Sequence, residues 1–192
     1  MIYASEALNR LKEGHQLFLS HQAMKVNTEQ HIHSLAENGQ HPFAVVITCS
    51  DSRVAPEILF HCQLGDIFTI RTAGNVISDI ELGSIEYAVD HLLVNLVLVL
   101  GHTHCGAVES VLHPHAAGSD CLHALLSRIE PSVQKALTEC CEQAAIADMA
   151  EDLNIENAMQ CIAHHSAFAG KKELQICGAK YDIETGRILY WK

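Results

Sequence analysis

The chain has 192 residues, of which 48% are hydrophobic and 18% are charged. This length and composition favour one domain with a full hydrophobic core, so we expect a single unit over 1–192. The net charge of −11 leaves 12 Lys and Arg against 23 acidic residues, which argues against nucleic-acid binding because that function needs a basic surface. The longest uncharged apolar run, 92–101, is far shorter than the roughly 20 residues of a membrane helix.

The amino terminus has no basic segment followed by an apolar stretch, so it does not resemble a secretory signal peptide. We therefore expect a cytoplasmic protein whose eight cysteines are mostly reduced. Six of them lie outside any motif and are expected to be small buried hydrophobic residues: Cys62, Cys121, Cys140, Cys141, Cys161 and Cys177.

Residues 1–40 predict a helical arm. The segment 5–22 reads as an amphipathic helix with Ser5 as its expected N-cap. One face of this helix carries residues at spacings of three and four, namely Leu8, Leu11, His15 and Phe18. A second helix, over 28–37, is expected to end at the turn Asn38-Gly39.

The rest of the chain, 41–192, predicts one α/β core. Four mainly apolar runs are typical of buried parallel strands, at 43–48, 66–71, 95–100 and 173–181. Helices are expected between and after these strands, at 79–93, 107–112, 121–129, 131–150 and 154–168. A short final strand, 187–191, is expected to lie antiparallel at an edge. The alternation predicts a doubly wound, mainly parallel sheet of about four parallel strands plus this edge strand, flanked by helices.

Three soft ligands follow two of the predicted strands. Cys49 comes directly after the first strand, and His102 and Cys105 follow the third. Ligands of doubly wound sheets bind beyond the carboxyl ends of strands, where the strand order reverses, so the three side chains are expected to converge. Two Cys and one His are a typical set for a catalytic zinc, which keeps its fourth position open. The alternatives are a closed structural zinc or three unrelated buried residues, whereas a redox pair is disfavoured because no C-x-x-C is present.

Asp51 and Arg53 lie close to this site in the sequence. Asp51 is two residues beyond Cys49 and could bind zinc itself as a conditional fourth ligand, which would close the site. Arg53 can hold the Asp51 carboxylate through a bidentate ion pair. Zinc would then keep its water, whose pKa falls to about 7, and the carboxylate would orient the resulting hydroxide. The alternative is an Asp–Arg pair that only braces a turn.

The segments 49–54 (CSDSRV) and 101–106 (GHTHCG) resemble the two signatures of the β-class carbonic anhydrases. The resemblance continues through 65–75, 84–89 and 177–186. It thus covers essentially the whole chain, and the amino-terminal helix is its least similar part.

This resemblance implies reversible hydration of carbon dioxide to bicarbonate and a proton. It implies one Zn²⁺ per chain, held by Cys49, His102 and Cys105, with Asp51 and Arg53 as a catalytic dyad. Gln40 matches a family glutamine that helps to bind substrate across a dimer interface, although it could also be a solvated loop residue. The backbone N–H of Gly106 is a further candidate contact to substrate. The family forms homodimers through amino-terminal helices, which often pair as a dimer of dimers.

Two more positions bear on the behaviour of the site. Some family members have a non-catalytic bicarbonate site that needs Trp three residues before the first Cys; here the residue is Val46, although Arg71 is kept. We therefore expect an open resting site without Asp51 on the zinc. His104 could carry protons to buffer because imidazole titrates near neutrality, or it could be a packing or solvent-facing group.

Two other functions remain open from the sequence. Relatives of the same scaffold hydrolyse carbonyl sulfide or carbon disulfide with the same ligands, and pocket shape, which separates these reactions, is not visible in a sequence. A non-catalytic zinc-binding homologue is the third possibility, and the intact pair of Asp51 and Arg53 argues against it.

Overall fold

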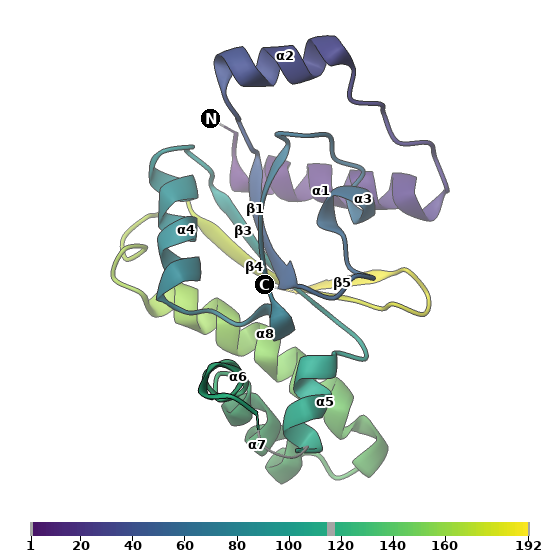
Figure 1. Ribbon diagram of the computed structural model, residues 1–192, viewed down its shortest axis with the longest axis vertical. Coiled ribbons are helices and arrows are strands. Elements are labelled where there is room, and N and C mark those ends of the chain that lie inside the picture. The colour runs from purple at the N-terminus through teal and green to yellow at the C-terminus, as the bar shows by residue number, and fades with distance from the viewer. Residues whose placement is uncertain (1, 115–117, 192) are drawn as a thin grey trace.

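The computed structural model describes residues 2–114 and 118–191 and contains a five-stranded sheet (Figure 1). The strands are β1 (Ala44–Cys49), β2 (Ile67–Thr72), β3 (Leu96–His102), β4 (Gln175–Tyr181) and β5 (Ile188–Trp191). Their order is β2-β1-β3-β4-β5, with the first four parallel and β5 antiparallel to β4. The predicted fold class, including the antiparallel edge strand, is confirmed.

Helices cover both faces of this sheet, which explains why its central strands are apolar on both sides. Every residue of β1 and β3 is buried. One face packs against α1 (Ala4–Leu19) and the short α3 (Pro56–Leu59). The other packs against α4 (Asp79–Asp90) and α8 (Ile146–His164). A parallel strand covered on both faces needs a continuous apolar sequence, as these two strands have.

A third apolar cluster lies beyond the carboxyl ends of the strands. It is formed by α5 (Gly106–Leu112), α6 (Asp120–Leu126), α7 (Glu130–Glu139) and part of α8, and it includes Cys49 and Cys105. Two 3₁₀ turns, Ala73–Asn75 and Gln143–Ala145, connect elements of this region. The functional end of the sheet is therefore enclosed by helices, at the lower end of Figure 1.

The amino-terminal arm differs from the prediction in its first helix only. α1 starts at Ala4, with Tyr3 at the N-cap position, so the prediction of Ser5 as N-cap was wrong. α2 (Glu29–Asn38) ends at the predicted Gly39, at φ 75°, and at its start the Thr28 hydroxyl accepts the His31 N–H at 3.2 Å. None of the residues of α2 is buried.

The predicted boundary between the last two long helices was wrong. α7 ends at Glu139, and α8 runs without a break through 151–153, where the sequence analysis placed a gap. Asn154 is a weak helix former, but here it is buried inside α8 and its amide donates to the Gly74 carbonyl at 2.8 Å. A contact distant in sequence thus overrides its local preference.

The cysteines are only partly buried. Cys62 and Cys177 are buried as predicted. The prediction was wrong for the exposed Cys121 and Cys141, and Cys140 and Cys161 are only half-buried. Cys121 lies in the first turn of α6, which buries none of its residues. No disulfide links any of the eight cysteines, all of which lie in the described part of the chain.

Thiol labelling should separate these cysteines. At about pH 8, near the ordinary pKa of a thiol, iodoacetamide should modify Cys121 and Cys141 rapidly in the native protein. Cys62 should react only after denaturation, because burial and the nearby Asp66 and Glu57 raise its pKa to about 12. Mass spectrometry of digested protein would measure the order, and early labelling of Cys62 would contradict the packing beneath α3.

A surface glycine offers a gain in stability. Gly83 lies inside α4 and is exposed, and a Cβ added there would meet no atom within 4 Å. Replacing Gly83 by Ala should raise the free energy of unfolding by about 0.5–1 kcal/mol, because Gly is a poor helix former. Urea unfolding would measure the change, and a loss of stability would contradict the open space at this position.

Among the described residues, no helix combines the length and the apolar character needed to cross a membrane.

Candidate metal centre

The three predicted ligands come from two neighbouring strand ends. Cys49 is the last residue of β1, and His102 is the last residue of β3. β1 lies between β2 and β3, so the chain order reverses between β1 and β3, as expected for a binding site. Cys105 occupies the N-cap position of α5. The ligand atoms of the three residues lie within 4.8 Å of one another, all three residues are buried, and no other such group occurs among the described residues.

The protonation of His102 suits a metal ligand. Its Nδ1 lies 2.8 Å from the Thr103 carbonyl oxygen, so Nδ1 carries the proton and donates. Its Nε2 is then an acceptor, and it is buried without a hydrogen-bond partner in the described structure. A buried imidazole nitrogen left in this state, with the other nitrogen fixed by a carbonyl, is the arrangement of a metal-binding His.

The two thiols complete a donor set suited to zinc. The Cys49 sulfur accepts N–H groups from Gly74 at 3.3 Å and Asp51 at 3.4 Å. The hydrogen bond from Cys105 is the largest effect that lowers the Cys49 pKa, burial opposes it, and His102 and these N–H groups add to it. The pKa of Cys105 is raised, because the Cys49 thiolate lies beside it and because it is buried. Two sulfurs and one imidazole nitrogen fit a borderline-soft divalent ion such as zinc.

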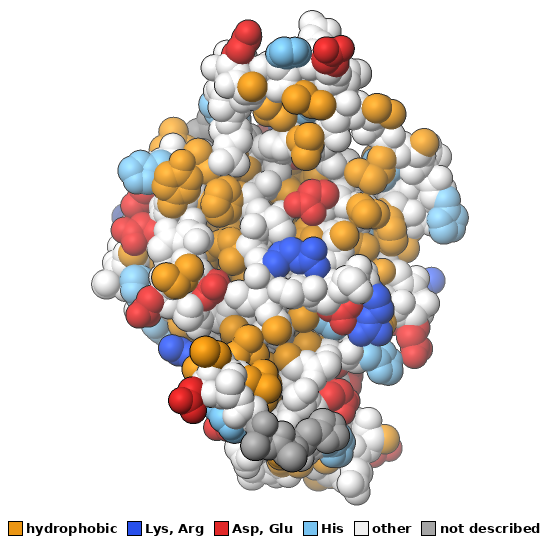
Figure 2. Space-filling view, in the orientation of Figure 1, with side chains coloured by type: hydrophobic (Ala, Val, Ile, Leu, Met, Phe, Trp, Pro, Cys, Tyr) orange, Lys and Arg blue, Asp and Glu red, His pale blue; other side chains and the backbone are white. Residues whose placement is uncertain are grey.

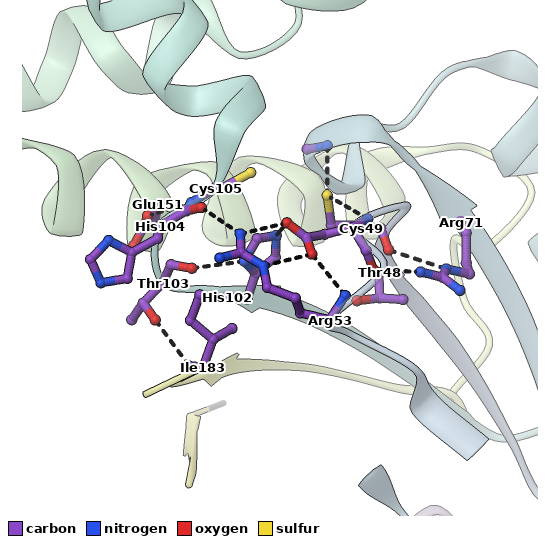
Figure 3. A network of polar contacts seen from close by, with 12 residues as sticks. Thr48, Cys49, Arg53, Arg71, His102, Thr103, His104, Cys105, Glu151 and Ile183 are labelled. Atoms are coloured by element: carbon purple, nitrogen blue, oxygen red, sulfur yellow. Dashed lines mark hydrogen bonds and ion pairs between the residues drawn. The ribbon is translucent and has the colours of Figure 1, made fainter. Parts of the chain in front are cut away.

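Asp51 and Arg53 form the predicted ion pair next to these ligands, with Arg53 labelled in Figure 3. The carboxylate Oδ1 accepts the Arg53 backbone N–H at 2.9 Å and its Nε at 3.0 Å, while Oδ2 accepts Nη2 at 2.7 Å. The guanidinium holds the pKa of Asp51 well below its usual range. Oδ2 also lies 4.0 Å from the His102 Nε2, so the carboxylate faces the ligand cluster while Arg53 holds it.

Arg53 and Arg71 fix the loop that carries this carboxylate. Arg53 also donates to the His104 carbonyl at 3.2 Å, which links the two ligand-bearing loops. Arg71, on β2, donates to the carbonyls of Cys49 at 3.2 Å and Asp51 at 2.7 Å. Its side chain therefore braces the backbone behind the site.

The other predicted site residues lie at different distances from the cluster. Gln40 is exposed and precedes β1, whereas Cys49 is the last residue of β1. The length of the strand, which rises about 3.3 Å per residue, therefore lies between them. Gly106 directly follows Cys105 and begins α5. The His104 ring is exposed and lies 3.2 Å from the Glu184 carboxylate, at φ 57° for its own backbone.

Two supporting residues were missed by the sequence analysis. Glu151 accepts the Cys105 backbone N–H at 3.0 Å, and Asn154 contacts the Gly74 carbonyl. No sequence motif connects residues of α8 with Cys105, which lies more than 40 residues earlier in the chain. The one available signal was Lys180 in a strand expected to be buried, because a buried Lys requires an acidic partner.

Comparison with known proteins agrees with this geometry. The model of the carbonic anhydrase family matches residues 44–188. A carbonic anhydrase of Mycolicibacterium smegmatis is 43% identical over 66% of this chain, and the match spans 63% of that relative's length. Carbonic anhydrase 2 of Mycobacterium tuberculosis is 36% identical over 94% of this chain and 89% of its own.

Solved structures show the same fold. The β-carbonic anhydrase CcaA superposes with a TM-score of 0.77 at 28% identity, over 96% of this chain and 95% of its own. A structure of tetrameric β-carbonic anhydrases from the filamentous ascomycete Sordaria macrospora superposes with a TM-score of 0.76 at 25% identity. The match covers 97% of this chain and 94% of that one. A mainly parallel sheet that brings two Cys and one His together at its reversal point defines an α/β protein with a site suited to zinc. The chain belongs to the carbonic anhydrase family, in its β class.

Proposed function

We propose that this protein catalyses the reversible hydration of carbon dioxide to bicarbonate and a proton. The observation that carries the proposal is the position of Asp51, whose carboxylate lies 4.0 Å from the unpartnered His102 Nε2 while Arg53 holds both of its oxygens. A protein that only stored zinc would have no use for a carboxylate beside an open coordination position.

Each residue of the centre has a separate task. Cys49, His102 and Cys105 would hold one zinc ion per chain. Zinc, when bound, supplies a Lewis acid that lowers the pKa of a coordinated water to about 7. Asp51 stays ionised at neutral pH because of Arg53, so it can accept a hydrogen bond from the attacking water and orient its lone pair toward carbon dioxide.

The contacts of Arg53 support an open resting site. Asp51 would have to leave three hydrogen bonds from Arg53 to become the fourth zinc ligand. Val46 stands where the bicarbonate-inhibited relatives have Trp, and Arg71 is engaged with backbone carbonyls. We therefore propose that Asp51 ligates zinc only conditionally and that bicarbonate does not lock the enzyme in a closed state.

A second copy of the chain would complete the site. Gln40 lies toward the amino end of β1 and the zinc ligands at its carboxyl end, so Gln40 can reach substrate only in a partner's site. Hydrophobic side chains gather on the upper part of the face shown in Figure 2. The exposed large hydrophobic residues of the described chain include Ile32, Ile58 and Tyr87. With tetrameric relatives of the same fold, we propose a homodimer or a dimer of dimers, with Gly106 also near substrate.

The location is proposed from redox chemistry. Eight cysteines without a disulfide suit a reducing compartment. We place the enzyme in the cytoplasm, with no nucleic acid or membrane among its partners.

The test is carbon dioxide hydration by stopped flow, with zinc content verified and the pH varied on either side of about 7. We expect fast hydration that rises with pH in the wild type and none in His102→Ala. Wild-type protein with one zinc per chain but without hydration would contradict the proposal. Hydrolysis of carbonyl sulfide or carbon disulfide by the same sample would then assign the alternative reaction.

A further inference from the structure

One turn of α8 supports the backbone at both sulfur ligands. Glu151 and Asn154 lie three residues apart on this helix, and only 5% and 4% of their surfaces are exposed. Glu151 Oε1 accepts the N–H of Cys105 at 3.0 Å (Figure 3). Asn154 donates to the carbonyl of Gly74, whose own N–H donates to the Cys49 sulfur at 3.3 Å. The contact to Cys105 is the more direct of the two.

A buried lysine fixes the Glu151 carboxylate. Its second oxygen lies 3.1 Å from the Nζ of Lys180, whose side chain is 8% exposed. The same ammonium contacts the carboxylates of Asp148 at 2.6 Å and Asp152 at 3.0 Å. A buried carboxylate without a charge partner would be costly, so Lys180 allows Glu151 to remain in this place. Lys180 pairs in the sheet with Gly101, the residue before His102.

We propose that Glu151, held by Lys180, is a positioning residue that fixes Cys105 and thereby sets how tightly this chain retains zinc. The proposal rests on the assignment of Cys105 as a zinc ligand. Cys105 starts a helix of only seven residues, so its turn has little support of its own. A shift of its backbone amide moves its sulfur, because only Cα and Cβ separate the two atoms. Residues that orient metal ligands in this way typically change metal affinity by about 10- to 100-fold when replaced.

A purely structural role would give different results. The Lys180 cluster also ties α8 to β4, and losing any of its carboxylates could lower stability. Asp152 offers a matched control, because its side chain is 46% exposed and its carboxylate contacts the same ammonium. Asp152→Asn therefore perturbs the ion-pair cluster and leaves the contact to Cys105 in place.

Two substitutions at Glu151 separate its hydrogen bond from its charge. Glu151→Gln keeps one acceptor oxygen for the Cys105 N–H but places its NH2 group against the Lys180 ammonium, which keeps Asp148 and Asp152. Glu151→Asp keeps the charge but is one methylene shorter, so it loses that reach. Zinc affinity would be measured on the metal-depleted full chain by competition with a chromogenic chelator. The cobalt-substituted proteins would be compared by their thiolate-to-cobalt absorption bands, which report the position of the sulfurs. Urea unfolding of the same samples would record stability.

We expect Glu151→Asp to weaken zinc binding by about 10- to 100-fold and to shift the cobalt bands, Glu151→Gln to lose less affinity than Glu151→Asp, and Asp152→Asn to stay near the wild type. Wild-type affinity and bands in Glu151→Asp would overturn the proposal. If Glu151→Asp and Asp152→Asn lost zinc affinity equally and their cobalt bands did not shift, the proposal would also be overturned. Glu151 would then have a purely structural role. A wild type that binds zinc no better than Cys105→Ser would instead refute the assignment of the metal site.

Discussion

Replacing Asp51 by Ala should lower kcat for carbon dioxide hydration by about 10²- to 10⁴-fold while one zinc per chain is retained. The substitution removes the carboxylate that faces the His102 Nε2 and leaves all three ligands unchanged. The pKa of Asp51 lies well below its usual range, so this carboxylate is ionised across the neutral range. The ratio of wild-type to variant kcat should therefore stay constant as pH is varied around neutrality. Stopped-flow kinetics with parallel zinc analysis would measure both quantities.

Ser52→Ala is the matched control for this experiment. Ser52 is exposed and lies between Asp51 and Arg53 in the same turn. Its replacement should leave kcat unchanged, which would show that the loss at Asp51 reflects the carboxylate and not a general disturbance of the loop. Full activity in Asp51→Ala, or release of its zinc, would contradict the role given to Asp51.

Replacing Gly14 by Ala should destabilise the protein by about 3 kcal/mol or more. Gly14 lies on the buried face of α1, and a Cβ at this position would come within 1.9 Å of the Phe60 carbonyl oxygen. The obstacle is backbone at the end of α3, so no side-chain rotation can relieve it. The helix would have to move outward, which would separate Leu11 and His15 from the core.

Urea unfolding of Gly14→Ala beside Gly83→Ala would test this packing. The same chemical change is expected to lower the free energy of unfolding at Gly14 and to raise it at Gly83. An added Cβ meets the Phe60 carbonyl at the first site and open space at the second. A Gly14→Ala protein as stable as the wild type would show that α1 does not lie against Phe60 in solution.

The sheet and the ligands could be predicted because their signals are local. Runs such as 43–48 and 95–100 are apolar at every position, which marks a strand covered on both faces. Cys49 and His102 end these runs within a residue or two, so the topology alone brought them together. The ion pair of Asp51 and Arg53 could be predicted because only Ser52 separates the two residues in one turn.

The contacts between distant segments could not be predicted in this way. α7 ends at Glu139, and its C-cap residue, Cys140, is neither Gly nor Pro, so the sequence contains no signal for this helix end. The predicted helix 154–168 began at Asn154, whose amide instead donates to the Gly74 carbonyl, 80 residues earlier, from inside α8. Glu151 has no motif at all, and its role depends on the packing of α8 beneath Cys105. Local patterns located the ligands, and only the fold revealed what supports them.

The two central strands also determine how long the ligands stay in place during native fluctuations. β1 and β3 are buried throughout and hydrogen-bonded on both sides, whereas α2 buries nothing. Amide protons of such central strands exchange with solvent only through the largest openings of a molecule, while those of a peripheral helix exchange through local fraying. We therefore expect the segments that carry Cys49 and His102 to exchange slowly, so that fraying of α2 leaves two of the three ligands in position.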